Sequence, residues 1–473
     1  MSNYPNSLLS KNLVIVVAGP TATGKSDVAA RLCAEEKGII ISADSVQAYR
    51  GVQIGANKPS KLDLEKTPHL LIDVADCTQN YNAAEWRADA RTAIQALLDP
   101  KSDADDTNPR ADDVIASVRS GRDAKGCSQD DTILPVVCGG TMMYIQWLVH
   151  GSPDTMRPSI EALEQAKEAI SDFQKKNDFQ AAKDHVSCFG QVFKDRVEGF
   201  CGNDWYRLRR TLEVALTVQT EEDKESMIEK LYTGERNGGL ESVGYDVRCF
   251  FLCPDDRMGH TKIIDKRCEQ MVVNGLLQET AGTLFVSFLG AVFLGSYRTF
   301  RIIHVIDLSL AEELPEMAAR AIGYRQTLDY LSKESLENNE SDEFDSFIND
   351  FTTATRRYAK KQMSWFRKDR EFMFVPVSLA AEKATRVDEA AAMIQQYCHM
   401  SRDDYESELY GSDSSSSMAK KKNLEQGKKM KLYQFERHIL KAGSEEYNQC
   451  LSQAIRCQRR MHKSKKRKLE ASS

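Results

Sequence analysis

Short, almost wholly apolar runs alternate with longer amphipathic stretches along the first half of the chain. The stretch Asn82–Leu98 places Trp86, Ala90 and Ile94 on one face at helical spacing. Continuous apolar runs, in contrast, are typical of strands that a parallel sheet buries on both faces. Such runs are Leu13–Ala18, Gly38–Ser42, His69–Val74, Ile133–Cys138 and, further on, Val247–Cys253. The alternation predicts a doubly wound parallel α/β sheet.

A glycine loop follows the first apolar run. It matches G-x-x-x-x-G-K-[ST], and a helical pattern follows over Asp27–Glu36. Strand, loop and helix in this order form a P-loop, in which loop N–H groups and the helix N-terminus face phosphate oxygens. The lysine reaches the terminal phosphates and the serine hydroxyl is a ligand for Mg²⁺. The alternative is a chance match. The pattern predicts a P-loop NTPase-like core whose diphosphate- or triphosphate-binding residues are Gly19, Thr21, Thr23, Gly24, Lys25 and Ser26, with Mg²⁺ on Ser26.

Two further segments follow predicted strands and should lie at the same edge of the sheet. Asp44 comes directly after the second strand, and Gly140 and Thr141 follow the strand Ile133–Cys138. Ligands of open α/β sheets bind beyond the carboxyl ends of the strands. We therefore expect Asp44 and Thr141 near the P-loop. A helix N-cap is the alternative role for Asp44.

The later part of the chain is mainly helical and charged. Arg207 and Arg210 form a basic stripe at i, i+3, for which a solvated helix face is the alternative. The segment Thr355–Arg370 mixes basic and aromatic residues, a composition that suits RNA phosphates and an unstacked base. Again the alternative is a solvated helix face. The polar segment 99–131 is predicted to be a flexible surface insertion.

Composition narrows the classes of protein that fit. The chain has 473 residues and a formal charge of −6, so an RNA-binding surface would need local clusters of basic residues. Its 12 cysteines contain no C-x-x-C pair and no secretory signal opens the sequence, which favours reduced thiols and a cytoplasmic location. The basic segment Arg459–Lys468 leaves open a nuclear pool, and a mitochondrial pool also stays open. The apolar stretch Leu284–Leu294 is too short to span a bilayer, so no membrane role is expected.

Several separate stretches, taken in order, resemble tRNA dimethylallyltransferases, also called tRNA isopentenyltransferases. Each motif alone is weak, but together they cover most of Leu13–Val377. They are Gly19–Ser26, Ser42–Gly51, Ile54–Pro59, Pro68–Asp73, Gly139–Tyr144, Asp204–Val214, Arg267–Met271, Gly275–Leu276, Arg320–Arg325 and Tyr358–Arg367.

The resemblance implies transfer of a dimethylallyl group from dimethylallyl diphosphate to N6 of adenosine 37, next to the tRNA anticodon. The products would be N6-dimethylallyladenosine and diphosphate. It implies a first core part at 1–154, an inserted helical tRNA-binding domain at 155–245 and a second core part with basic tRNA-contacting helices at 246–400. A largely disordered polar and basic tail would follow at 401–473. The P-loop would then hold the prenyl diphosphate instead of ATP.

The resemblance also implies roles for individual residues. Lys25 and Arg267, with Mg²⁺ on Ser26, would neutralise the departing diphosphate. Asp44 would accept the N6 proton and Thr141 would hydrogen-bond nearby. The residues expected to contact the anticodon stem-loop are Asp44, Ser45, Gln47, Tyr206, Arg207, Arg210, Arg320, Gly323, Tyr324 and Arg325.

The chain departs from the family pattern in two places. The apolar stretch Gly282–Val305 has no counterpart in the family, and a retained intron is one hypothesis for it. The last cysteines and histidines lack the paired Cys-x₂₋₄-Cys spacing of a zinc finger, so no zinc is expected. By analogy the protein should be a monomer. The rivals are an adenylate isopentenyltransferase, a P-loop small-molecule kinase or NTPase, and a non-catalytic RNA-binding protein.

Overall fold

The computed structural model describes most of the chain as two compact units. The described residues are 9–77, 79, 81–100, 108–128, 131–153, 158–200, 204–217, 236–282, 321–333, 339–411, 426, 430 and 433–472. The first unit combines Met1–Leu148 with Gly244–Ser473, and the second is Val149–Val243. The second unit thus interrupts the first in sequence, and it begins a few residues before the expected boundary at 155.

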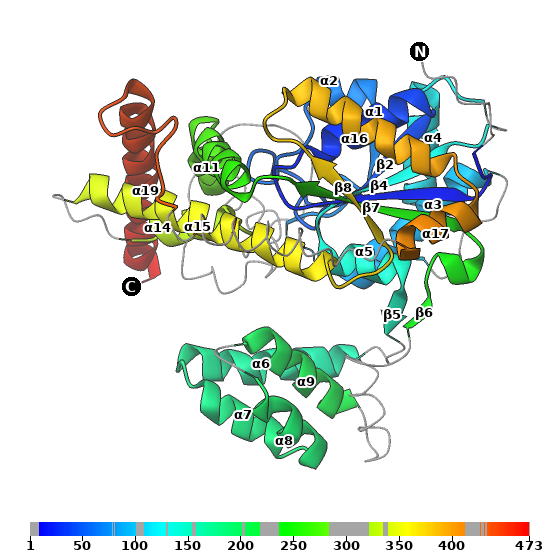
Figure 1. Cartoon of the computed structure of the whole chain (residues 1–473). Helices are drawn as coiled ribbons and strands as arrows, with labels where there is room; N and C mark the ends of the chain where they lie inside the picture. The colour runs from blue at the N-terminus through cyan, green and yellow to red at the C-terminus, as the bar shows by residue number, and fades with distance from the viewer. Residues whose placement is uncertain are drawn as a thin grey trace. The chain divides into compact units, whose positions relative to one another are not determined.

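A six-stranded parallel sheet forms the centre of the first unit (Figure 1). The strand order is β3-β2-β4-β1-β7-β8, so β1 lies inside the sheet between β4 and β7. Every residue of β1, β2 and β4 is buried, which explains why their sequences are continuous apolar runs. The strands are β1 Leu13–Ala18, β2 Gly38–Ala43, β3 His69–Leu70, β4 Leu134–Gly139, β7 Asp246–Pro254 and β8 Phe372–Val377. The predicted parallel α/β sheet is confirmed.

Helices cover the sheet and extend from it. Ile15 and Val17 of β1 pack in one apolar cluster with α1 (Lys25–Glu35) and α16 (Lys383–Cys398). Trp86 of α3 and Tyr144 of α5 stack with ring centroids 4.6 Å apart, and the Trp86 indole donates to the Ser42 carbonyl of β2. The other helices of this unit are α2 Lys61–Lys66, α3 Ala83–Leu98, α4 Ala111–Ala124, α5 Met142–Val149, α11 Arg257–Val273, α14 Tyr324–Leu331, α15 Glu340–Phe366, α17 Arg402–Gly411 and α19 Glu445–Ser472.

The prediction of a flexible insertion at 99–131 is wrong for the described residues 108–128. Helix α4 occupies 111–124, and Val114, Val118 and Gly121 lie on its buried face at i, i+4 and i+7. The Asn108 side chain donates to Asp89 and Thr92 of α3. The polar composition belongs to the exposed face of an amphipathic helix and therefore does not indicate a lack of structure.

The prediction of a largely disordered tail at 401–473 is wrong for 402–411 and 433–472. Helix α19 packs against α14 and α15, and Cys450, Ala454, Cys457 and Met461 form its buried stripe. Such a narrow stripe buries one face of a helix whose composition is mostly polar. Tyr405 of α17 is also buried in the sheet cluster.

The second unit is a small helical domain with a two-stranded ribbon at its base. Its helices enclose their own apolar core, which includes Phe193, Leu208 and Leu212. Its elements are β5 Gly151–Pro153, α6 Ile160–Lys175, α7 Phe179–Ser187, α8 Gln191–Glu198, α9 Trp205–Thr217, β6 Arg236–Gly238 and the 3₁₀ turn η1 Glu241–Val243; β5 and β6 are antiparallel.

Two sequence predictions concern apolar segments: that no segment spans a membrane, and that the stretch Gly282–Val305 departs from the family pattern. Among the described residues, no helix has the length and apolar character needed to cross a membrane. Residues 283–305 of the apolar stretch Gly282–Val305 lie outside the described residues.

Candidate functional site

The P-loop joins the carboxyl end of β1 to helix α1. Gly24 precedes α1 with φ +89°, a left-handed conformation that favours glycine. The Thr23 hydroxyl and the Lys25 ammonium both donate to the Pro20 carbonyl, at 2.8 Å each. Burial lowers the pKa of Lys25 to about 8. A bound anion would offset that cost, which is the environment expected of a phosphate-binding lysine.

Two side chains from other helices, His260 of α11 and Gln362 of α15, hydrogen-bond to the backbone of the P-loop. The Gln362 side chain accepts from the Thr21 N–H at 3.0 Å and donates to the Gly140 carbonyl at 2.8 Å. His260 Nε2 lies 2.8 Å from the Thr21 carbonyl, which can only accept, so this nitrogen carries the proton. Gln362 therefore fixes the P-loop to the glycine segment after β4. Sequence reasoning missed both side chains.

The segment after β2 forms a tight turn around Asp44. Asp44 Oδ1 accepts from the N–H groups of Val46 and Gln47, at 2.9 and 3.3 Å. The Thr141 hydroxyl accepts from the Ser45 N–H at 3.0 Å. Asp44 thus stabilises a turn and does not cap an α-helix. These bonds fix its carboxylate beside Thr141, as the sequence predicts.

Arg267, from α11, brings a cation to the same place. Its side chain is half-buried, and burial lowers the pKa of its guanidinium. Among the described residues, no hydrogen bond or ion pair to this guanidinium occurs. A half-buried cation without a partner is well suited to an anionic ligand.

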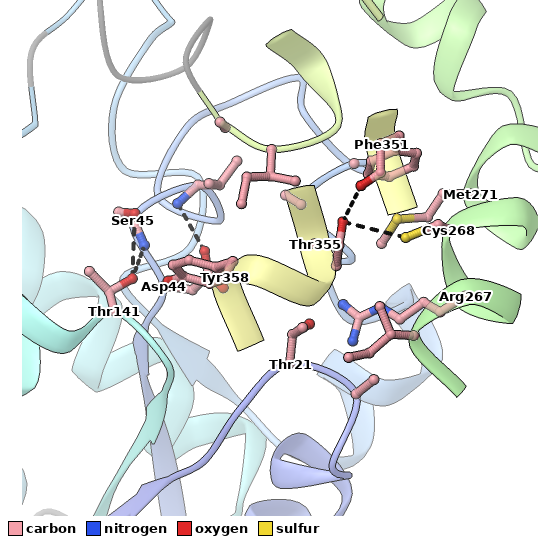
Figure 2. A pocket seen from close by; sticks show the side chains of 17 residues that line it. Thr21, Asp44, Ser45, Thr141, Arg267, Cys268, Met271, Phe351, Thr355 and Tyr358 are labelled. Carbon is pink, nitrogen blue, oxygen red and sulfur yellow. Dashed lines mark hydrogen bonds between the residues drawn. The ribbon is translucent and has the colours of Figure 1, made fainter. Parts of the chain in front are cut away.

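One cavity of about 320 Å³ collects these groups (Figure 2). Thr21 and Ala22 of the P-loop, Asp44 and Arg267 line it together with an apolar wall. That wall includes Ile264, Cys268, Met271 and Phe351, and burial raises the pKa of Cys268 to about 12, so its thiol stays neutral. The cavity therefore combines a phosphate-binding end, a carboxylate and an apolar surface.

The predicted RNA-contacting residues fall in three places. Ser45 lines the cavity, whereas Gln47 does not line it and donates from its side-chain amide to the carbonyls of Ala56 and Asn57. On α9 of the second unit, Tyr206 and Arg207 are exposed, and Arg210 pairs with Glu213. These three residues belong to the second unit, whereas the residues that line the cavity belong to the first.

The predicted contacts on α14 are only partly as expected. Gly323 precedes the helix with φ +97°, and Arg325 is exposed. Tyr324, in contrast, is fully buried and donates its hydroxyl to Glu279. The prediction that its side chain touches RNA is therefore wrong for the described structure, because the residue packs inside the fold. Arg320 lies outside the described residues.

The predictions about metals concern Mg²⁺ on Ser26 and the absence of zinc. Within the described ranges, no group of three or more His, Cys, Asp or Glu side chains is placed to hold a metal ion. Ser26, the expected Mg²⁺ ligand, is the second residue of α1. One protein ligand fits Mg²⁺ at a phosphate site, since this ion usually keeps several waters and takes its other ligands from phosphates. Absence of zinc stays a prediction.

A family model described as IPP transferase matches residues 47–102 and 122–369. The chain is 33% identical over 382 residues to tRNA dimethylallyltransferase 9 of Arabidopsis thaliana, covering 76% of this chain and 70% of the relative. It is 28% identical over 371 residues to tRNA dimethylallyltransferase of Protochlamydia amoebophila, covering 78% and 86%.

A solved structure of a eukaryotic dimethylallyltransferase acting on tRNA is also similar. Its TM-score is 0.52 at 19% identity, with 98% of each chain covered, so this likeness bears on the fold alone. The residues matched by the family model begin after the P-loop and Asp44. The assignment of those groups rests on their motif and geometry.

Proposed function

Since the chain belongs to the IPP transferase family, we propose that it transfers a dimethylallyl group from dimethylallyl diphosphate to N6 of adenosine 37 in tRNA. The observation that carries the proposal is the cavity that the P-loop, the carboxylate of Asp44 and Arg267 line together, with Arg267 free of hydrogen bonds and ion pairs among the described residues. Such a site offers positive charge for a diphosphate and a carboxylate that can accept a proton.

The positive charges near the P-loop suit the diphosphate of the donor. The N–H groups at the start of α1, Lys25 and Arg267 would bind the diphosphate oxygens. Mg²⁺ held through Ser26 would supply further positive charge to the leaving group. Departure of diphosphate takes the electron pair of the C1–O bond, and these cations stabilise the charge that develops on that oxygen.

The acceptor end centres on Asp44. The N6 lone pair of adenosine forms the new N–C1 bond, and the amine then loses a proton. Asp44 would accept that proton, because its Oδ1 is already fixed by two backbone N–H groups and the carboxylate lines the cavity. Thr141 would orient the amine or the turn that carries Asp44.

Reaching N6 requires the adenosine to leave the stack of its anticodon loop and enter the cavity. Exposed basic side chains suit the RNA backbone: Arg207 on α9, and Arg357, Lys360 and Lys361 on α15.

We propose a monomer that acts in the cytoplasm. None of the described cysteines forms a disulfide, which suits a reducing compartment.

A transfer assay tests the proposal. The full chain with Mg²⁺ and labelled dimethylallyl diphosphate is offered an anticodon stem-loop, the same stem-loop with guanosine at position 37, or AMP; ATP hydrolysis is measured alongside. We expect label only in the adenosine-37 stem-loop. Label in AMP would indicate an adenylate isopentenyltransferase, and ATP hydrolysis without prenyl transfer would indicate a kinase or NTPase.

A further inference from the structure

One wall of the cavity is a loop whose backbone is held by a single carboxylate. Gly55 and Ala56 of this loop line the cavity. Glu279 accepts hydrogen bonds from three successive backbone N–H groups, those of Gln53, Ile54 and Gly55, at 2.7 to 3.0 Å. Backbone N–H groups need hydrogen-bond partners, and one carboxylate supplies the partner for three of them here, so the loop conformation depends on this carboxylate.

Tyr324 completes the arrangement. Its hydroxyl donates to Glu279 Oε1 at 2.5 Å, and its ring lies so close to Gly55 that a Cβ there would be 2.5 Å from the ring carbon Cζ. The side chain is fully buried. Tyr324 therefore fixes the direction of the Glu279 carboxylate. Its ring also packs directly against Gly55, where no larger residue fits.

The loop is connected to the Asp44 turn and not to the P-loop. The Gln47 amide donates to the carbonyls of Ala56 and Asn57, while the Gln47 backbone N–H donates to Asp44 Oδ1. The P-loop has its own support from Gln362 and His260. A displacement of this loop would thus change the position of Asp44 before it changes the position of the P-loop.

We propose that Glu279 is a positioning residue for the acceptor side of the site. Together with Tyr324 it holds the Gly55–Ala56 wall and, through Gln47, the Asp44 turn in the geometry that receives the adenine. The inference rests on the proposed function, because it assigns the wall to the acceptor of that reaction. It assigns Glu279 no contact with either substrate.

The test measures the effect on the acceptor, the stem-loop, separately from the effect on the donor, dimethylallyl diphosphate. In Glu279→Gln, an NH₂ group faces the loop N–H groups in place of one acceptor oxygen. We expect KM for the adenosine-37 stem-loop to rise about tenfold, since a small misplacement of a reacting group is costly. The dissociation constant for dimethylallyl diphosphate should stay within about twofold of the parent value, because the P-loop keeps its supports.

Glu269 provides a matched control elsewhere in the same unit. Its carboxylate also accepts from three successive backbone N–H groups, those of His438, Ile439 and Leu440, but it does not line the cavity. Glu269→Gln should lower the unfolding temperature to a similar extent and leave both constants unchanged. Loss of folded protein alone would lower kcat for either variant without changing KM.

Two further variants keep the test decisive if Glu279→Gln does not fold. Tyr324→Phe removes only the hydroxyl, and Glu279→Asp keeps the charge on a shorter side chain; each should raise the acceptor KM by a smaller factor. Unchanged acceptor KM in the folded variants, or an equal rise in Glu269→Gln, would overturn the inference alone. A parent protein that transfers nothing to the stem-loop would overturn the proposed function, and the acceptor role with it.

Discussion

At the scale of single residues, the carboxylate and the cation that line the cavity differ in their hydrogen-bond partners. Asp44 is tied to the backbone of its own turn through Oδ1, which fixes the direction of the carboxylate. Arg267 has no such partner among the described side chains, although burial disfavours its charge. The carboxylate is therefore oriented in advance, and the guanidinium is well suited to an anionic ligand.

The first prediction concerns Asp44. Asp44→Asn keeps an oxygen that can accept from Val46 and Gln47 but removes the capacity to take a proton. We expect the single-turnover rate of prenyl transfer to fall about 10²–10⁴-fold, with donor affinity unchanged, as loss of a general base does. Rapid-quench measurement with saturating stem-loop checks this.

The control for that prediction is another carboxylate with backbone contacts. Asp63 bonds to the Ser60 N–H at the start of α2, and Asp63→Asn should leave the transfer rate unchanged. An Asp44→Asn protein as fast as the parent would remove Asp44 from proton transfer.

The second prediction is a pH dependence carried by His260. Burial lowers its pKa to about 4, against an ordinary value of 6.5, and its neutral form donates to the Thr21 carbonyl. Because the unfolded chain binds this proton first as pH falls, the folded state loses stability between pH 6.5 and 4. The loss amounts to about 3 kcal/mol for one such shift.

Urea unfolding at pH 7.5 and 4.5 measures this contribution. His260→Gln keeps an N–H donor for Thr21 and does not titrate, so its stability should fall less than that of the parent over the same pH range. Equal falls in both proteins would show that His260 is not the residue responsible. Transfer activity of the variant at pH 7.5 reports whether the P-loop is still intact.

At the scale of elements, α15 presents different kinds of side chain on its inner and outer sides. Tyr358 and Gln362, four residues apart, face the site, whereas Arg357, Lys360 and Lys361 are exposed. The sequence predicts a basic RNA-facing helix at 355–370 but gives no signal for its inner face. Gln362 was missed because a neutral amide has no distinctive pattern: its importance lies in joining two loops far apart in the chain.

The third prediction tests this inner face. Gln362→Leu leaves the Thr21 N–H without a partner, at a cost of about 1–3 kcal/mol for such a group, and leaves the Gly140 carbonyl only the Tyr358 hydroxyl, at 3.3 Å. We expect donor affinity to fall about tenfold, because the P-loop loses its support. Equilibrium binding of labelled dimethylallyl diphosphate measures the change.

Gln458 on α19 offers the comparison. It is equally buried and donates to the Tyr330 carbonyl, away from the cavity. Gln458→Leu should cost stability and leave donor affinity unchanged. If both variants weaken donor binding to the same extent, the effect of Gln362 is general destabilisation.

Other elements show where sequence patterns stop being informative. Strands β1, β2, β4 and β7 were predicted from the sequence because each is a continuous apolar run, and the P-loop because its motif sits between a strand and a helix. Strand β8 was not predicted, and β3 covers only His69–Leu70 of the predicted strand His69–Val74. Helices α4 and α19 were not, because each contributes only a narrow buried stripe to a polar segment. Whether such a stripe is buried depends on a partner elsewhere in the chain, such as α3 for α4, and composition does not reveal that partner.

At the scale of the whole molecule, a net charge of −6 has to be reconciled with an RNA substrate. The two units supply exposed basic residues separately: α9 in the second unit and α15 in the first. Each phosphate contact releases counterions, so local basic residues can support binding despite the overall charge. The binding of RNA should therefore be salt-dependent, and each unit should contribute part of the slope.

The fourth prediction assigns part of that slope to the second unit. Arg207 is the most suitable residue, since its side chain is 60% exposed and its ion pair with Asp204, at 3.4 Å, is a surface one. Arg207→Ala should weaken stem-loop binding and reduce the slope of log K against log salt by about 1. Arg31→Ala on α1, an exposed arginine with acidic neighbours Glu35 and Asp388, should leave the slope as it is. An unchanged slope for Arg207→Ala would place that side chain on a solvated face and shift RNA binding towards α15, because a lost phosphate contact cannot leave counterion release unaltered.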